Sequence, residues 1–128
     1  MEDMLSETKV QDASLATGLA NSLGELLQEH KGQDVSVLDL REMNGWTDFF
    51  VIATVSSNTH MDGLERHIKE FCREKEIEIL GKSRRPESGD DEWRLIDLGQ
   101  AVVHLMSKTA RDFYELERLW AAIPASRQ

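Results

Sequence analysis

Cysteine is almost absent from this sequence, which has one, Cys72, among its 128 residues. A single cysteine cannot form an internal disulfide or supply a metal site made of several thiolates. It is compatible with a reducing compartment. Because Cys72 follows Phe71 in an apolar pattern, we interpret it as a small core residue and not as a catalytic thiol.

Long hydrophobic runs are missing as well. The longest, from Phe49 to Val55, is far shorter than the roughly 20 apolar residues of a membrane-spanning helix. The N-terminal segment MEDMLSETKV is acidic, and it has neither the apolar stretch of a secretory signal nor the Arg-rich, acid-poor composition of a transit peptide. We therefore expect a soluble, cytoplasmic protein that does not bind membranes.

Basic residues are scarce relative to acidic ones. The chain has 15 Lys and Arg residues against 24 Asp and Glu residues, which gives a formal net charge of −9. Affinity for a phosphate backbone comes from Lys and Arg side chains that displace counterions. The composition therefore argues against direct, sequence-specific binding of nucleic acid. It favours a basic protein as the partner.

The four histidines do not have the spacing of helical zinc ligands. His60, His67 and His104 are not three or four residues apart. His30 lies near the end of a predicted helix, where a cation is favoured in any case. We expect structural or surface roles for all four histidines, and neither a metal site nor a cofactor.

Two carboxylates raise the question of an enzyme. Asp39 and Asp48 lie in apolar strand contexts, and paired carboxylates can hold Mg²⁺ for nucleotidyl transfer. The sequence lacks a Gly-Ser loop followed by a tight Asp-x-Asp pair, and it has no Gly-rich phosphate loop. Its acidic run Asp90-Asp91-Glu92 lies in a polar loop. We expect no catalytic residues, and a nucleotidyltransferase-like enzyme that uses Mg²⁺ and nucleotide stays open as an alternative.

Apolar periodicity predicts a first helix, with Asp12 or Ser14 as its cap and Gly32 as its stop. Its leucines recur at three- and four-residue spacing: Leu15, Leu19, Leu23, Leu26 and Leu27. Residues 1–11 are polar and unpatterned, so we expect a loose tail there. Strands follow at residues 35–40 and 49–55. The second is apolar on both faces, which is typical of a strand in the middle of a sheet.

The second half of the chain is predicted to form a helix, three strands and a last helix. The first helix follows Ser56-Ser57-Asn58-Thr59, and Thr59 and Asp62 have the spacing of a capping box. The strands cover residues 77–80, 93–98 and 101–106, with a polar loop at 81–92 and a tight hairpin turn at Gly99-Gln100. The last helix begins near Ser107 or Lys108 and ends before Pro124.

The predicted order αββαβββα indicates an α/β (α+β) fold in which helices cover a mixed sheet. The sequence contains no internal repeat and no linker between domains. We expect a single domain over residues 12–123, with a flexible N-terminal tail at 1–11 and a C-terminal tail at 124–128.

Alternation along residues 93–98 divides their side chains between two faces. Trp93, Leu95 and Asp97 share one face, and Arg94, Ile96 and Leu98 share the other. From pattern alone, Trp93 and Leu98 are core residues and Asp97 caps the hairpin turn. The other interpretation is an interface, in which Trp93 supplies large buried area and Asp97 meets a basic residue at the rim.

Several motifs occur in a characteristic order. They are DVSVLDL at 34–40, TDFFVIA at 47–53, SS at 56–57, WRLIDLG at 93–99, VVHLM at 102–106 and ARDFYELERLW at 110–120. This ordered set resembles the Iojap, or ribosomal silencing factor, family. The match runs from about the first helix through Trp120, and so it covers nearly the whole folded part.

The resemblance implies a non-enzymatic factor that binds the large ribosomal subunit through large-subunit ribosomal protein fourteen. Binding there blocks docking of the small subunit and lowers translation when nutrients are short. The implied fold is similar to that of nucleotidyltransferases, a mixed sheet of about five strands, without their activity. Trp93, Asp97 and Leu98 fall on positions that the family uses for this partner.

The family also self-associates, so the resemblance implies a homodimer in the free state. The segment that contains Tyr114, Glu117 and Trp120 has the pattern of a helix that docks on its own sheet. We keep these three residues as candidates for secondary partner or dimer contacts. A dimeric assembly scaffold therefore stays open as a second alternative.

Overall fold

The computed structural model describes residues 2–43, 47–84 and 92–115. The elements are α1 (Glu2–Glu29), β1 (Gln33–Asp39), the short 3-10 helix η1 (Arg41–Met43), β2 (Phe49–Val55), α2 (Asn58–Lys75), β3 (Gly81–Arg84), β4 (Trp93–Asp97), β5 (Ala101–Ser107) and α3 (Lys108–Tyr114). This arrangement confirms the predicted order αββαβββα and the mixed α+β class.

The five strands form one sheet in the order β1-β2-β5-β4-β3. β2 and β5 pair in parallel, and the other three pairings are antiparallel. All seven residues of β2 are buried, which confirms that the strand with two apolar faces lies inside the sheet. A parallel pair needs a long crossover connection, and here α2, β3 and β4 lie between its two strands in the chain.

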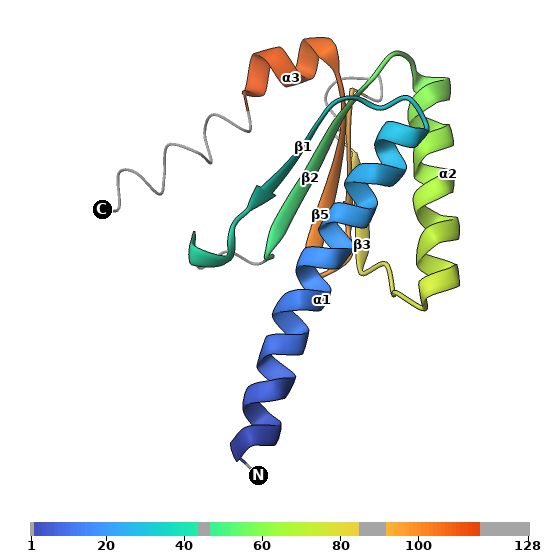
Figure 1. Cartoon of the computed structure of the whole chain (residues 1–128). Coiled ribbons are helices and arrows are strands. Elements are labelled where there is room, and N and C mark those ends of the chain that lie inside the picture. Colours follow the sequence, from blue (N-terminus) through green and yellow to red (C-terminus); the bar gives the residue numbers. More distant parts are fainter. Residues whose placement is uncertain (1, 44–46, 85–91, 116–128) are drawn as a thin grey trace.

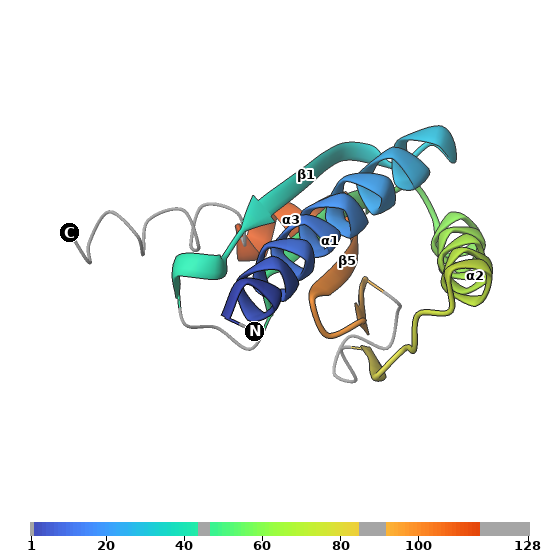
Figure 2. The same ribbon diagram turned by 60° about the horizontal axis from the view of Figure 1, so that its bottom comes forward.

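Helices cover the two faces of the sheet unequally (Figures 1 and 2). α1 and α2 lie on one face, called here the first face, and α3 packs against the second face. The core under α1 and α2 contains Leu23, Leu27, Leu64 and Ile68 from the helices. The smaller core on the second face consists of Leu40, Phe50, Ile52, Val102, Met106 and Ala110.

α1 begins at Glu2, earlier than the start predicted at Asp12, so residues 2–11 are helical and not unpatterned coil. This segment contains neither Gly nor Pro, and nothing in it opposes extension of a helix. The leucine pattern predicted only the part of α1 that packs on the sheet, where Leu23 and Leu27 are fully buried. It carried no information about the helix upstream.

The connection from α1 to β1 requires a glycine at position 32. The Gly32 amide donates a hydrogen bond to the carbonyl oxygen of Leu27 at 2.7 Å. A Cβ on Gly32 would lie 2.8 Å from that oxygen and 3.3 Å from the Cβ of Ala53. The glycine predicted to end the helix is therefore needed because the end of α1 packs closely against β2.

The N-terminus of α2 differs from the prediction. The cap is Ser57, whose hydroxyl accepts a hydrogen bond from the His60 amide at 3.0 Å, and so the capping box predicted for Thr59 and Asp62 is wrong. Ser57 and Thr59 are both residue types that favour the cap position, and the helix begins early enough for Ser57 to take it. Cys72 is buried in the core of the first face, as predicted, and burial raises the pKa of its thiol.

The third strand lies further along the chain than predicted. It spans Gly81–Arg84 and pairs with β4 alone, whereas the predicted residues 77–80 are irregular. Ile77 and Ile79 still pack against the core, and this explains the misleading apolar alternation. An edge strand needs one hydrogen-bonded neighbour and no apolar face of its own, so the polar β3 had been interpreted as part of a loop.

The hairpin between β4 and β5 turns at Gly99-Gln100, as predicted. Gly99 has a φ of +89°, and the Leu98 amide donates to the Ala101 carbonyl at 2.9 Å. α3 begins at the predicted place, with Ser107 as its cap. It ends at Tyr114, because Glu115 adopts the left-handed conformation, and this end lies before Pro124, as predicted. Residues 116–128 lie outside the described part of the chain.

We expect Gly32→Ala to destabilise the fold by about 1 to 3 kcal/mol, because its new Cβ would overlap the Leu27 carbonyl. Gly63→Ala is the matched control, since a Cβ there meets nothing within 4 Å. Alanine is also more favourable than glycine in the interior of a helix, by about 0.8 kcal/mol or more. Urea denaturation measures both. Equal stability of the two variants would contradict the role assigned to Gly32.

Candidate partner-binding site

Trp93 is the first residue of β4, and it lies opposite Met106 of β5. Its side chain is partly exposed and packs at the margin of the core on the second face. Ile96 and Leu98 belong to the core on the first face. The predicted division of this strand into two faces is therefore confirmed.

The Trp93 ring is fixed by two aromatic neighbours. Its indole N–H donates a hydrogen bond to Nδ1 of His104 at 3.0 Å. The ring of Tyr114, at the end of α3, lies 4.8 Å from it between centroids. A large aromatic side chain that is partly exposed and already held in one orientation has the character of an interface hot spot.

His104 is the least accessible member of this aromatic group, with 2% of its surface exposed. Indole N–H groups only donate hydrogen bonds, so Nδ1 of His104 accepts and the imidazole is the neutral tautomer with its proton on Nε2. Burial lowers the pKa of His104 to about 4. The bond to Trp93 is therefore intact at neutral pH. Sequence reasoning had assigned His104 a structural role and had missed its link to Trp93.

Asp97 lies at the other end of β4. One of its carboxylate oxygens accepts a hydrogen bond from the Gly99 amide at 2.8 Å, which confirms the prediction of a turn-capping carboxylate. The side chain is also partly exposed. Four residues of strand separate it from Trp93 by roughly 13 Å, and so one partner can contact both residues only along the length of β4.

Leu98 is 6% exposed and belongs to the core on the first face. It lines a groove of about 480 Å³ between α1 and α2, together with Leu15, Gly18, Leu19, Ser22, Phe71, Lys75, Ile77 and Gln100. The structure thus separates Leu98 from Trp93 by the thickness of the sheet. A partner can reach Leu98 only through this groove.

Of the three candidates for secondary partner or dimer contacts, the structure describes Tyr114. Tyr114 packs on Trp93 and on the core of the second face. Its neighbour Phe113 is 75% exposed and lies 4.9 Å from it between ring centroids. Glu117 and Trp120 lie outside the described residues.

A buried ion pair holds β4 against α2. Nη1 of Arg94 lies 2.8 Å from Asp62 and 2.9 Å from Glu65, and Lys82 of β3 lies 3.3 Å from Glu65. Burial raises the pKa of Glu65, but hydrogen bonds from Lys69, Arg94 and Lys82 outweigh it, and so the pKa lies below its ordinary value. This network fixes the strand that carries Trp93.

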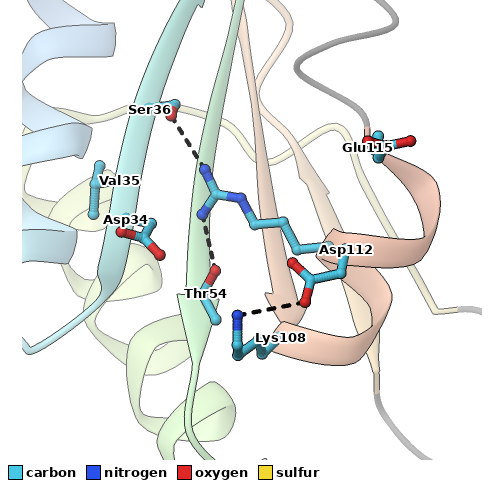
Figure 3. Close-up of a pocket in the computed structure, with 8 residues that line it drawn as sticks. Asp34, Val35, Ser36, Thr54, Lys108, Asp112 and Glu115 are labelled. Atoms are coloured by element: carbon cyan, nitrogen blue, oxygen red, sulfur yellow. Dashed lines mark hydrogen bonds and ion pairs between the residues drawn. The ribbon is translucent and has the colours of Figure 1, made fainter.

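A pocket of about 790 Å³ lies on the second face between β1, β2 and α3 (Figure 3). Arg111 donates hydrogen bonds to the hydroxyls of Thr54 at 2.9 Å and Ser36 at 3.1 Å, and to the Gln33 carbonyl at 3.4 Å. The register of β1 against β2 shifts between Gln33 and Ser36, the two β1 residues that accept from Arg111. Arg111 therefore fastens α3, and with it Tyr114, to β1 and β2.

Of the two aspartates considered for catalysis, Asp39 uses its carboxylate in an ion pair, and Asp48 is held through its backbone. Asp39 forms an ion pair with Arg41 at 2.7 Å, and the hydrogen bonds from Arg41 lower its pKa. Asp48 contributes backbone hydrogen bonds to Leu40 and Gln100. Among residues 2–43, 47–84 and 92–115, no three His, Cys, Asp or Glu side chains are arranged to hold a metal ion.

Three histidines that are distant in sequence meet at the ends of α1 and α2. The rings of His30 and His67 stack with centroids 3.5 Å apart. Nε2 of His60 lies 3.0 Å from the His30 carbonyl, and its Nδ1 accepts a hydrogen bond from the Ser56 amide at 3.1 Å. Their sequence spacing gave no sign of this contact, because it depends on how the two helices pack.

Comparison with known proteins decides the family. The model of the family described as "Ribosomal silencing factor during starvation" matches residues 12–128. The chain belongs to this family. The predicted resemblance to Iojap and ribosomal silencing factors is thereby confirmed.

Relatives of this silencing-factor chain come from bacteria and from eukaryotic organelles. The ribosomal silencing factor of Treponema pallidum is 38% identical over 82% of this chain and 92% of its own. A mouse protein named mitochondrial assembly of ribosomal large subunit protein 1 is 30% identical over 89% of this chain and 54% of its own. A crystal structure of a Chromobacterium violaceum protein has a TM-score of 0.70 and 30% identity, covering 81% of this chain and 85% of its own.

The described helices of this family member include none that is both long enough and apolar enough to cross a membrane.

The ion-pair network predicts unequal effects for its two carboxylates. Glu65→Gln should destabilise the fold by about 3 kcal/mol, because it leaves the buried Arg94 without its buried counter-charge. Asp62→Asn, whose side chain is 60% exposed, should cost about 1 kcal/mol or less. Guanidinium denaturation of both variants tests this, and a larger loss for Asp62→Asn would contradict it.

The buried histidine predicts a pH dependence. The unfolded chain binds a proton at His104 near pH 6.5, whereas the folded chain does so only near pH 4. Between these values the unfolded state binds more protons, and so stability falls as the pH is lowered from 6.5 to 4, by roughly 3 kcal/mol in total. His104→Leu should lack this contribution. If the free energy of unfolding changed with pH in the same way for the wild-type protein and the variant, the assignment would be refuted.

Proposed function

We propose that this protein binds the large ribosomal subunit through large-subunit ribosomal protein fourteen, and that its presence there keeps the small subunit from joining. The result is repression of translation when nutrients are limiting. Family membership supports the ribosomal assignment, and the name of the mouse relative refers to the large subunit. The mechanism is steric exclusion, so it needs neither a catalytic residue nor a cofactor.

The observation that carries the proposal is the state of Trp93. It is partly exposed at a strand end, and His104 and Tyr114 hold its ring. Immobilised aromatic side chains bind with little further loss of conformational entropy, and tryptophan is enriched among hot spots. We assign Trp93 as the principal contact with the ribosomal protein.

Charge supports a protein partner. The net charge of −9 repels the RNA that makes up most of a ribosomal surface and attracts basic proteins embedded in it. Arg94 of β4 and Arg111 of α3 bond within the fold. Asp97 provides a partly exposed carboxylate that can meet a basic residue at the rim of the contact.

Leu98 contributes in a different way from Trp93. Since the two side chains lie on opposite faces, a flat partner cannot cover both. We propose that an apolar side chain of the partner enters the groove beside Leu98, while the main contact forms at Trp93. Such a partner extends around the narrow edge formed by β4 and the four-residue strand β3.

We further propose that the protein acts in the cytoplasm and forms a homodimer when free, with the region of Tyr114, Glu117 and Trp120 at the dimer contact. The exposed ring of Phe113 beside Tyr114 supports an interface at α3. A dimeric scaffold without ribosome binding is the alternative that a pull-down with large subunits excludes.

The enzymatic alternative has one observation in its favour, the pocket of about 790 Å³ that contains Lys108 and Arg111. Asp34, Asp112 and Glu115 also line it, and they oppose the binding of a nucleotide phosphate. A thermal shift on addition of Mg²⁺ and ATP would support the enzyme. An unchanged melting temperature agrees with the binding protein.

The central test is co-sedimentation with purified large ribosomal subunits. Trp93→Ala should weaken binding by about 30-fold, equal to a hot-spot loss of about 2 kcal/mol. Phe113→Ala is the matched control, because it removes a more exposed aromatic ring from the neighbouring helix. Circular dichroism checks that both variants keep their helix content.

Two results would overturn the proposal. Subunits that join normally at saturating protein rule out steric exclusion. Binding that is lost equally in the Trp93 and Phe113 variants, or in neither, removes Trp93 from the principal contact.

A further inference from the structure

We infer that His104 is a positioning residue for partner binding, whose Nδ1 holds the Trp93 indole in the orientation that the partner meets. The inference rests on the proposed function, in which Trp93 contacts the ribosomal protein. His104 itself is buried and touches no partner. It acts through the 3.0 Å hydrogen bond from Trp93.

The strand register makes this contact possible. Trp93 lies opposite Met106, and His104 lies opposite Leu95, so the two side chains are diagonal neighbours on the second face. Trp93 is at the end of its strand, where fewer neighbours restrict its χ angles. A hydrogen bond to a residue in the middle of β5 therefore ties the partly exposed ring to the central strand of the sheet.

The chemistry of His104 favours this role over simple core packing. Nε2 of His104 is buried and has no hydrogen-bond partner among the described residues, and a buried polar group in this state is destabilising. A leucine or phenylalanine would fill the same space without that penalty. Among the described residues, the one hydrogen bond of the His104 side chain is with Trp93, and this bond is what an apolar residue could not provide.

Two further aromatic rings contact His104 and Trp93. Phe50 of β2 meets the His104 ring edge to face at 4.4 Å between centroids. Tyr114 of α3 lies 4.8 Å from the Trp93 ring between centroids. Phe50, His104, Trp93 and Tyr114 thus form a continuous series of ring contacts, within which His104 accepts the indole proton.

The test compares two variants of similar size, His104→Leu and His104→Asn. The asparagine side chain has an oxygen near the position of Nδ1 and can accept the indole proton, whereas leucine cannot. The Trp93 indole N–H resonance, identified among the three tryptophans by its loss in Trp93→Phe, reports the bond directly. Co-sedimentation with large subunits reports its effect on binding.

We expect His104→Leu to shift the Trp93 indole resonance, to accelerate its exchange with solvent and to weaken binding about three- to tenfold, as expected for one side chain that must be ordered on binding. His104→Asn should restore both properties. A core role alone would change stability in the two variants and would not produce this rescue.

The outcomes separate this inference from the proposed function. If the wild-type protein does not bind large subunits, the proposed function fails, whatever the resonance shows. If Trp93→Ala loses binding while His104→Leu binds like the wild type, the positioning role is wrong. Should His104→Leu not fold, the wild-type protein decides, because a Trp93 indole proton that exchanges as fast as free indole overturns the inference.

Discussion

The candidate site depends on the pairing of β5 with β2 on one side and β4 on the other. β5 is the central strand of the sheet, and its residues from Ala101 to Met106 are all buried. Its even-numbered residues face the second core, and this puts His104 between Phe50 and Trp93. Any change in this register by one residue would turn His104 to the opposite face and release the indole.

Two internal arginines connect this central pairing to the helices. Arg94 joins β4 to α2 through Glu65, and Arg111 joins α3 to β1 and β2 through Ser36 and Thr54. Both guanidinium groups are thereby engaged within the fold. The net charge of −9 is the physical basis for proposing a basic protein, rather than RNA, as the partner.

Elements with a complete local signal were predicted correctly. The apolar strand β2, the hairpin at Gly99-Gln100 and the start of α3 near Ser107 depend on residues that are adjacent in sequence. The errors occurred where distant contacts decide. Ile77 and Ile79 alternate like a strand but pack on the core from an irregular segment, and β3 is a strand only because β4 lies beside it.

The sequence alone determined the order of elements, the acidic charge, the family and the division of β4 into two faces, because periodicity, composition and ordered motifs are properties of the linear chain. It also identified Asp97 as a turn cap. Only the tertiary structure decided that Leu98 lies in a groove between α1 and α2, and that the buried His104 accepts the Trp93 indole proton. Both depend on strand register and helix packing, which bring together residues whose spacing in the sequence carries no trace of the contact.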